Sequence, residues 1–242
     1  KKSIDNAVEN NLKRLQTDYM DLYQIHWPER NTNFFGKRGY NYKTGEVWEE
    51  NFEVILDALK DHIKKGNIRY IGISNETPWG TMRYLSASEN NRPRVRTIQN
   101  PYSLLNRTFE VGNSEICHRE DFGLLAYSPL AFGVLSGKYR GGKKPENARL
   151  TLFPNYDRYS SDPCKKAVEA YYALAEKNGL TLTQLSLAFV NDRPFVTSNI
   201  IGATSISQLR ENIETASIKL SDEILEEINI IHESIPNPST CL

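Results

Sequence analysis

Hydrophobic residues along the chain follow the pattern of an α-helix in some segments and of a buried β-strand in others, and the two kinds of segment alternate. Near the start, Ile4, Val8, Leu12 and Leu15 recur at the spacing of one helix face, which predicts an amphipathic helix from about residue 3. The run "DLYQIHW" at 21–27 then has the apolar and aromatic residues of a buried strand. The beginning of the chain therefore predicts a helix followed by a strand.

The same alternation continues to the end of the chain. Further short apolar runs predict strands at 68–75, 95–100, 123–130 and 197–204. Helices are predicted at 52–66, from Thr77-Pro78 onward, and at 110–119, 163–177, 181–190, 205–216 and 221–234. Two long loops are predicted, at 29–49 and 131–161. Most of the strands are apolar on both faces, which is typical of a parallel sheet covered by helices.

The five predicted strands, each followed by helix, indicate an α/β fold in a single domain spanning residues 1–242. No Gly-x-Gly-x-x-Gly turn follows any of these strands, so a (β/α) barrel is favoured over an open doubly wound sheet. A full barrel of this kind has about eight strand–helix units, and the chain supplies fewer.

Composition argues against several kinds of partner. Lys+Arg and Asp+Glu both number 30, and a chain of zero net charge has no long-range field to attract nucleic acid or an anionic membrane. No apolar run approaches the roughly 20 residues of a membrane helix. Three cysteines at long spacings, Cys117, Cys164 and Cys241, form no metal-binding pattern and favour reduced thiols in a cytoplasmic protein.

Polar residues gather where the predicted strands end. His26 ends the first strand, and Ser74 with Asn75 ends the second. The remaining strand ends carry Gln99 and Asn100, then Tyr127 and Ser128, then Gly202, Ala203 and Thr204. Barrel enzymes place their sites at the carboxyl ends of the strands, so these side chains are candidates for a common site.

The segments "DLYQIHWP", "GISN", "TIQNPYSLLNR", "LLAYSPLAFGVLSGKY" and "IIGATSISQLRENIE" resemble the successive strand-end motifs of the aldo-keto reductases. The segments "FGKRGYNY" and "IQNPYSLLNRTFEVG" are most similar to the bacterial Tas-type, NADP(H)-dependent members. The resemblance implies a (β/α)8 TIM barrel, of which this chain holds roughly the last five units. It also implies NADP(H)-dependent reduction of an aldehyde or ketone to an alcohol.

In that family a tyrosine donates the proton, assisted by a lysine and an aspartate. The formal match from Asp18 to Tyr23 is rejected, because alternation along the strand turns Tyr23 toward the helices and Gln24 and His26 the other way. The three catalytic groups and the first barrel units are therefore expected to be absent from these residues. The chain expressed alone is expected to be unstable and inactive, since an incomplete barrel has unpaired edges.

The resemblance assigns His26 to the substrate carbonyl, which a neutral imidazole polarises by donating a hydrogen bond, and Trp27 to an apolar pocket wall. A lone histidine is otherwise most often a core residue. Ser74, Asn75 and Gln99 are assigned to the nicotinamide carboxamide, although such residues also terminate strands and cap helices. Tyr127 is assigned to stacking on the nicotinamide ring, with core packing as the alternative.

The remaining cofactor assignments also come from the resemblance. Lys138 is assigned to the pyrophosphate and Arg149 to the 2′-phosphate of NADP(H). Without the resemblance, both would be interpreted as charged side chains exposed to solvent. The helix start near Thr204 is assigned to phosphate, and Gln208 and Asn212 share the helix face expected toward the adenosine. The other residues assigned to the cofactor are Ser128, Pro129, Leu130, Gly202 and Glu211.

A second interpretation belongs to a different class. Some barrels of this family are nucleotide-sensing partners of other proteins, such as the β-subunits of potassium channels. The same cofactor residues would then report redox state, and carbonyl reduction would not be the function.

Overall fold

The computed structural model describes residues 2–33, 37 and 39–239. These residues form two compact units. The first contains the described residues within 1–34, 40–99 and 112–124, and the second contains those within 35–39, 100–111 and 125–242. Each unit is described by itself below.

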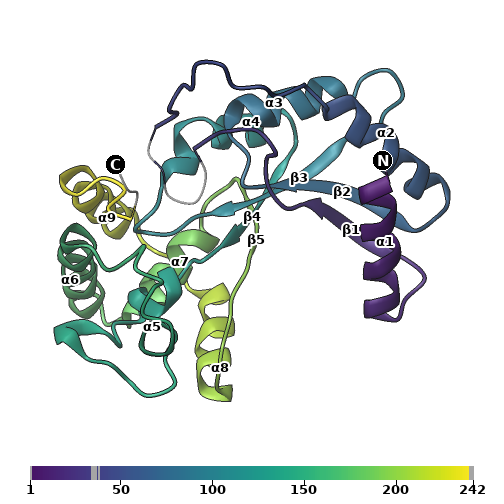
Figure 1. The fold of residues 1–242 in the computed structure, drawn as a ribbon. Coiled ribbons are helices and arrows are strands. Elements are labelled where there is room, and N and C mark those ends of the chain that lie inside the picture. Colours follow the sequence, from purple (N-terminus) through teal and green to yellow (C-terminus); the bar gives the residue numbers. More distant parts are fainter. Residues whose placement is uncertain (1, 34–36, 38, 240–242) are drawn as a thin grey trace. The chain divides into compact units, whose positions relative to one another are not determined.

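The predicted five strands are present, and they are hydrogen-bonded in chain order (Figure 1). Their bounds are β1 (Met20–Ile25), β2 (Ile68–Ser74), β3 (Val95–Pro101), β4 (Gly123–Tyr127) and β5 (Val196–Asn199). β2 pairs in parallel with β1, where Gln24 lies opposite Gly72, and with β3, where Ser74 lies opposite Gln99. The α/β class, with helix after each strand, is confirmed by this order.

The helices of the first unit are α1 (Lys2–Leu15), α2 (Phe52–Lys64), α3 (Pro78–Ala87) and α4 (Asn113–Arg119). The predicted start of α3 is confirmed, because the Thr77 side chain accepts a hydrogen bond from Gly80 N–H and Pro78 fills the first turn. The end of α2 is also as predicted, since Gly66 takes a left-handed φ of +80° just after the helix.

The core of the first unit lies between β1–β3 and the helices. Ile71, Ile73 and Ile98 from the strands are at most 1% exposed, and so are Leu56 and Leu59 of α2. Burying each such side chain contributes about 1.5–3 kcal/mol. This packing fixes the strand ends on which the candidate polar residues sit.

The second unit is built around α7 (Leu182–Asn191), most of whose residues are buried. Thr181 and Gln184 form a capping box at its start, which explains the predicted boundary. The other α-helices are α5 (Arg149–Leu152), α6 (Asp162–Lys177), α8 (Ile206–Glu214) and α9 (Asp222–Ser234). Short 3₁₀ helices are η1 (Thr108–Val111), η2 (Ala131–Ser136), η3 (Arg140–Gly142) and η4 (Thr215–Ser217).

Two sequence predictions need correction in the second unit. The segment 131–161 is not an open loop, because it contains η2, η3 and α5 and packs the ring of Phe132 against Tyr159. The last strand ends at Asn199, so Gly202 and Thr204 lie beyond it. The backbone there is engaged by α8 instead, since Asn212 Nδ2 donates to the Gly202 carbonyl at 3.3 Å.

Among the described residues, no helix is both long and apolar enough to cross a membrane.

Candidate functional site

In the first unit, the predicted residues Ser74, Asn75 and Gln99 lie together where β2 and β3 end. Ser74 Oγ donates to the Gln99 carbonyl at 2.7 Å, and Asn75 N–H donates to the same carbonyl at 3.1 Å. Ser74 and Asn75 are buried, and Gln99 is half-buried. Asn75 has a left-handed φ of +56°, a conformation that asparagine tolerates better than most residues. The backbone of two strand ends is thereby locked by hydrogen bonds.

A fourth residue, Gln24 of β1, completes this cluster. Gln99 Nε2 donates to Gln24 Oε1 at 2.8 Å, and Gln24 Nε2 reaches the Ile73 carbonyl at 3.5 Å. Sequence analysis placed Gln24 on the same strand face as His26 but assigned it no role. The alternation along the strand was the sequence signal that could have identified Gln24, because a glutamine directed inward from a strand needs hydrogen-bond partners.

His26 follows β1 directly, and its backbone is tied to the same cluster. Asn75 Nδ2 donates to the His26 carbonyl at 2.9 Å and to Ser74 Oγ at 3.1 Å. The exposed imidazole stacks on Trp27, with ring centroids 4.4 Å apart and planes inclined by 21°. A histidine with a fixed main chain and an accessible ring can present an N–H to a bound carbonyl oxygen.

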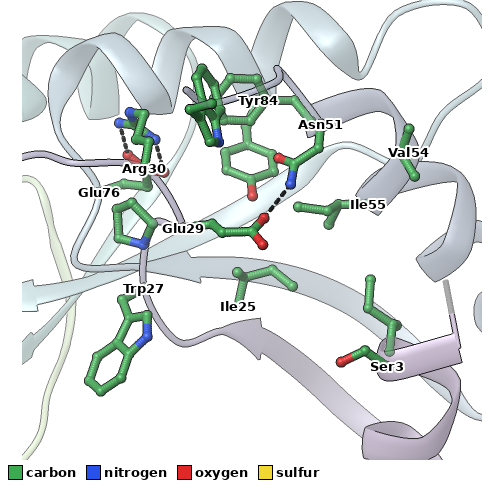
Figure 2. Close-up of a pocket in the computed structure, with 14 residues that line it drawn as sticks. Ser3, Ile25, Trp27, Glu29, Arg30, Asn51, Val54, Ile55, Glu76 and Tyr84 are labelled. Carbon is green, nitrogen blue, oxygen red and sulfur yellow. Dashed lines mark hydrogen bonds and ion pairs between the residues drawn. The ribbon is translucent and has the colours of Figure 1, made fainter. Parts of the chain in front are cut away.

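The opposite side of β1 faces α2. Ile25 lines a cavity of about 350 Å³ together with Phe52 and Ile55 of α2 (Figure 2). Tyr23 alternates in phase with Ile25, and burial raises the pKa of its phenol. The rejection of Tyr23 as a proton donor to substrate stays a prediction.

In the second unit, Tyr127 closes β4 and a tight turn follows it. The Tyr127 carbonyl accepts from Tyr102 N–H at 3.2 Å, and Ala131 N–H donates to the Ser128 carbonyl at 2.9 Å. Burial raises the pKa of Tyr127 to about 12, although nearby Arg158 partly opposes the shift. Pro129 is buried and Leu130 is half-buried in this turn. The tyrosine therefore offers a neutral aromatic ring at neutral pH.

The two predicted cations of the second unit sit against aromatic rings. Lys138 Nζ lies 5.5 Å from the centre of the Tyr139 ring, and a Cβ on Gly133 would approach Lys138 Nζ to 2.9 Å. The Arg149 guanidinium lies 4.3 Å above the Phe132 ring and is exposed. Both cations are held by π contacts and remain accessible to an anion.

The helix predicted from Ser205 is present as α8, and Thr204 lies just before its cap. Ser205, not Thr204, caps the helix, because its Oγ accepts from Gln208 N–H at 3.3 Å. Thr204 N–H and Oγ1 donate to Gln208 Oε1 at 3.0 and 3.2 Å. The Thr204 N–H expected to meet phosphate is therefore engaged by a side chain.

The other predicted residues of α8 are also engaged. Glu211 accepts from Thr181 Oγ1 at 2.7 Å, which joins α8 to the start of α7. Asn212 is 5% exposed and supports the Gly202 carbonyl, so it lies inside the fold. Gln208 and Asn212 are four residues apart on one helical turn, as predicted, but Asn212 is buried and Gln208 is only half-buried.

Two predicted features fall partly outside the described residues. These are the segment "FGKRGYNY", of which 35, 36 and 38 are undescribed, and the carboxyl-terminal stretch that includes Cys241. Within the described ranges, no group of three or more His, Cys, Asp or Glu side chains is arranged to hold a metal ion.

Comparison with known proteins assigns the family. The sequence model of the Aldo/keto reductase family matches residues 1–233. The Escherichia coli protein Tas is 50% identical over 240 residues, covering 99% of this chain and 69% of that protein. An aldo-keto reductase of Babesia bovis is 39% identical, covering 96% of this chain and 87% of that protein. The Schizosaccharomyces pombe "Aldo-keto reductase yakc [NADP(+)]" is 30% identical, covering 93% of this chain and 61% of that protein. The chain thus belongs to the Aldo/keto reductase family, a family of oxidoreductases that act on small carbonyl substrates.

Proposed function

We propose that this chain serves NADP(H)-dependent reduction of an aldehyde or ketone to an alcohol, with His26 orienting and polarising the carbonyl. The observation that carries the proposal is the network joining Ser74, Asn75 and Gln99 to the His26 main chain. It places an accessible imidazole beside a cluster of buried amide and hydroxyl groups. Such clusters are positioned before a ligand arrives, and this lowers the reorganisation that binding requires.

The residues of each unit have chemistry that suits part of the cofactor. A nicotinamide carboxamide needs donors and acceptors at fixed places, and Ser74, Asn75 and Gln99 offer both. Phosphates need cations or N–H donors, and Lys138 and Arg149 are accessible cations. Tyr127 offers an aromatic face for stacking. When bound, NADPH would supply the hydride to the carbonyl carbon, and the proton on the oxygen would come from the family's tyrosine, which is expected to lie outside these residues.

The residues of this chain act on the oxygen of the substrate. The His26 ring N–H donates a hydrogen bond to the carbonyl oxygen, which gains negative charge as the carbon is reduced. Trp27 stacks on the imidazole and covers one of its faces, which limits the orientations of that ring. The side chain of Asn75 holds the His26 carbonyl, so the main chain that carries the imidazole is fixed relative to β2.

We further propose NADP(H) as the cofactor, one aldo-keto reductase domain over residues 1–242, and a cytoplasmic setting. The name of the Schizosaccharomyces pombe relative specifies NADP(+), and the family match runs across both units. Cys117 and Cys164 are buried and form no disulfide in the described part of the chain, which suits a reducing compartment. Within the proposal, Ser128 to Leu130, Gly202, Thr204 and Gln208 contribute main-chain or side-chain contacts to the cofactor. Glu211 and Asn212 shape the helix that carries Gln208.

The test is NADPH oxidation by the full-length protein with a panel of aldehydes and ketones. Wild type is compared with His26→Ala and with His118→Ala, which removes an exposed histidine of α4 as a matched control. Loss of turnover in His26→Ala alone supports the proposal. Tight NADPH binding with no turnover across the panel would favour the nucleotide-sensing alternative, which none of the relatives named above supports.

A further inference from the structure

A buried ion pair lies next to the His26 and Asn75 segments. Arg30 Nη1 donates to Glu76 Oε1 at 2.9 Å, and Arg30 Nη2 donates to Glu76 Oε2 at 2.7 Å. The two side chains are only 8% and 3% exposed. Figure 2 shows this two-pronged contact, with Trp27 directed away from it. A bidentate pair fixes both the distance and the relative orientation of its partners.

Aromatic rings surround the guanidinium. The Arg30 Cζ atom lies 4.9 Å from the centre of the Trp79 ring, 5.8 Å from Phe52 and 5.9 Å from Trp48. Cation–π contacts of this kind strengthen when water is excluded. The charged group is therefore held on several sides.

The neighbouring helix is shaped to admit the pair. A Cβ on Gly80 of α3 would lie 2.0 Å from Glu76 Oε2 and 2.5 Å from Arg30 Nη2. Thr77, the cap of α3, donates its N–H to Glu76 Oε2 at 3.0 Å and accepts from Arg30 Nη2 at 3.2 Å. Glycine is unfavourable inside a helix, so its presence here indicates that space for the pair is needed.

The pair joins the same two segments as the contact between Asn75 and His26. Arg30 lies four residues after His26, and Glu76 directly follows Asn75. The segment from His26 to Arg30 is thus held at one end by Asn75 and at the other by Glu76. A buried ion pair contributes little net stability compared with apolar residues of similar size, so fixed geometry is its main contribution.

We propose that Arg30 and Glu76 are positioning residues for carbonyl reduction, which hold the His26 segment in register with Asn75. The inference rests on the function proposed above for His26 and Asn75. It adds two residues that touch neither substrate nor cofactor in that function. Their effect would be seen in the geometry of hydride transfer and in nicotinamide binding.

The first experiment removes both charges together in the full-length protein, as Arg30→Met with Glu76→Gln, so that no unpaired charge is left buried. The matched control is Arg69→Met with Asp21→Asn. That pair joins β1 and β2, the strands that precede the Arg30 and Glu76 segments, at 2.6 Å, but its side chains are 54% and 69% exposed. Both double variants conserve net charge.

The readouts separate positioning from folding. We expect the buried-pair variant to lose roughly tenfold or more in kcat, as small misplacements of reacting groups do, and to bind NADPH more weakly. The isotope effect on kcat with deuterated NADPH should rise, because hydride transfer becomes slower relative to other steps. A merely structural role would reduce the fraction of active protein while leaving the Kd of NADPH and the isotope effect at their wild-type values.

A second variant disturbs the pair without changing any charge. Gly80→Ala puts a methyl group into the pair, while Ser86→Ala is the control at an exposed position of the same helix. Helix propensity alone predicts that Gly80→Ala stabilises α3. We expect the same kinetic changes as in the double variant instead.

The outcomes separate a failure of the proposed carbonyl reduction from a failure of the positioning role of Arg30 and Glu76. If the wild-type protein shows no NADPH-dependent reduction, the proposed function is wrong. If wild type is active and His26→Ala is impaired, but the double variant and Gly80→Ala behave like their controls, then the positioning role of Arg30 and Glu76 is wrong. Should the double variant fail to fold, Gly80→Ala and the charge-conserving Arg30→Lys decide the matter by the same readouts.

Discussion

The two units differ in how their candidate site residues are held. In the first unit, Ser74, Asn75 and Gln99 bond to one another and to strand carbonyls, and two of them are buried. In the second unit, Arg149 is exposed on an aromatic face, and Thr204 bonds to Gln208 of the helix that follows it, α8. The first set is joined into one hydrogen-bond network, whereas Arg149 and Thr204 each have separate partners.

This difference corresponds to the chemistry proposed for each set. Reduction requires the carbonyl and the nicotinamide to meet in a narrow range of geometries, so rigid supporting groups lower the barrier. Phosphate recognition depends mainly on charge, which tolerates longer and more mobile side chains. Substitutions in the network of the first unit should therefore lower kcat or weaken NADPH and NADH by the same factor, whereas substitutions of the cations in the second unit should change mainly the Kd of the cofactor.

The largest effect is expected at His26. His26→Ala should lower kcat/KM for carbonyl reduction by roughly 10²-fold or more, the range for a positioned catalytic group. The Kd of NADPH should change little, because the imidazole is assigned to the substrate. Weak NADPH binding with normal reduction of bound substrate would instead make His26 a cofactor or structural residue.

The second prediction concerns the cations of the second unit. Arg149→Ala should weaken NADPH and spare NADH, because the 2′-phosphate distinguishes the two, and the loss of a charge-assisted bond of about 1.5–3 kcal/mol is roughly 10- to 100-fold. Lys138→Ala should weaken both cofactors, because they share the pyrophosphate. Fluorescence titration measures all four constants, and added salt should shrink the Arg149 effect since that side chain is exposed.

If Arg149→Ala weakened NADPH and NADH equally, the 2′-phosphate contact would lie elsewhere. Gln208 would then be the next position to test. The Gln208 side chain would have to break its hydrogen bond with the Thr204 N–H in order to contact a ligand.

A smaller effect is expected at Gln24, which supports the network without touching a ligand. Gln24→Leu removes the acceptor of the Gln99 amide, at a cost of about 0.5–1.5 kcal/mol, or roughly two- to tenfold in Kd. NADPH and NADH should weaken by the same factor, so the preference between them serves as an internal control. A changed preference would contradict the separation between the two sets.

The smallest effect at neutral pH is expected for Tyr127→Phe, which keeps the ring. The pKa of Tyr127 is about 12, above the ordinary tyrosine value of about 10, so the neutral phenol is favoured in the folded state. The stability that this provides is complete below pH 10 and is lost as pH rises toward 12. Alkaline unfolding followed by circular dichroism should therefore be less steep in Tyr127→Phe, and kcat/KM at pH 7 should be almost unchanged. A large loss of activity at pH 7 would show that the hydroxyl itself contacts a ligand.

The sequence predicted those features that depend on local pattern. The five strands and the starts of α3 and α7 follow from apolar runs and from Thr77-Pro78 and Thr181. The strand-end motifs located Ser74, Asn75 and Gln99, which the fold brings together. Parallel strands with polar ends make that meeting a consequence of topology.

Features that depend on distant partners were not predicted. The folded segment 131–161 needs the packing of Phe132 on Tyr159, 27 positions later, and its residues have no clear periodicity. The N–H of Thr204, assigned to phosphate, is instead engaged by Gln208 Oε1 of the following helix. Arg30 and Glu76 were overlooked because charged residues in loops are most often solvated, and only the fold encloses these two.

The left-handed backbone at Asn75 limits how this part of the protein can be varied. Its φ of +56° costs most residues about 1–3 kcal/mol, while glycine, asparagine and aspartate adopt it more readily. A randomised library at position 75 would therefore be filtered first by backbone geometry and only afterwards by side-chain chemistry. Libraries aimed at the nicotinamide end of the site would recover more functional variants from positions 99 and 24, whose strand conformation accepts a much wider range of residues.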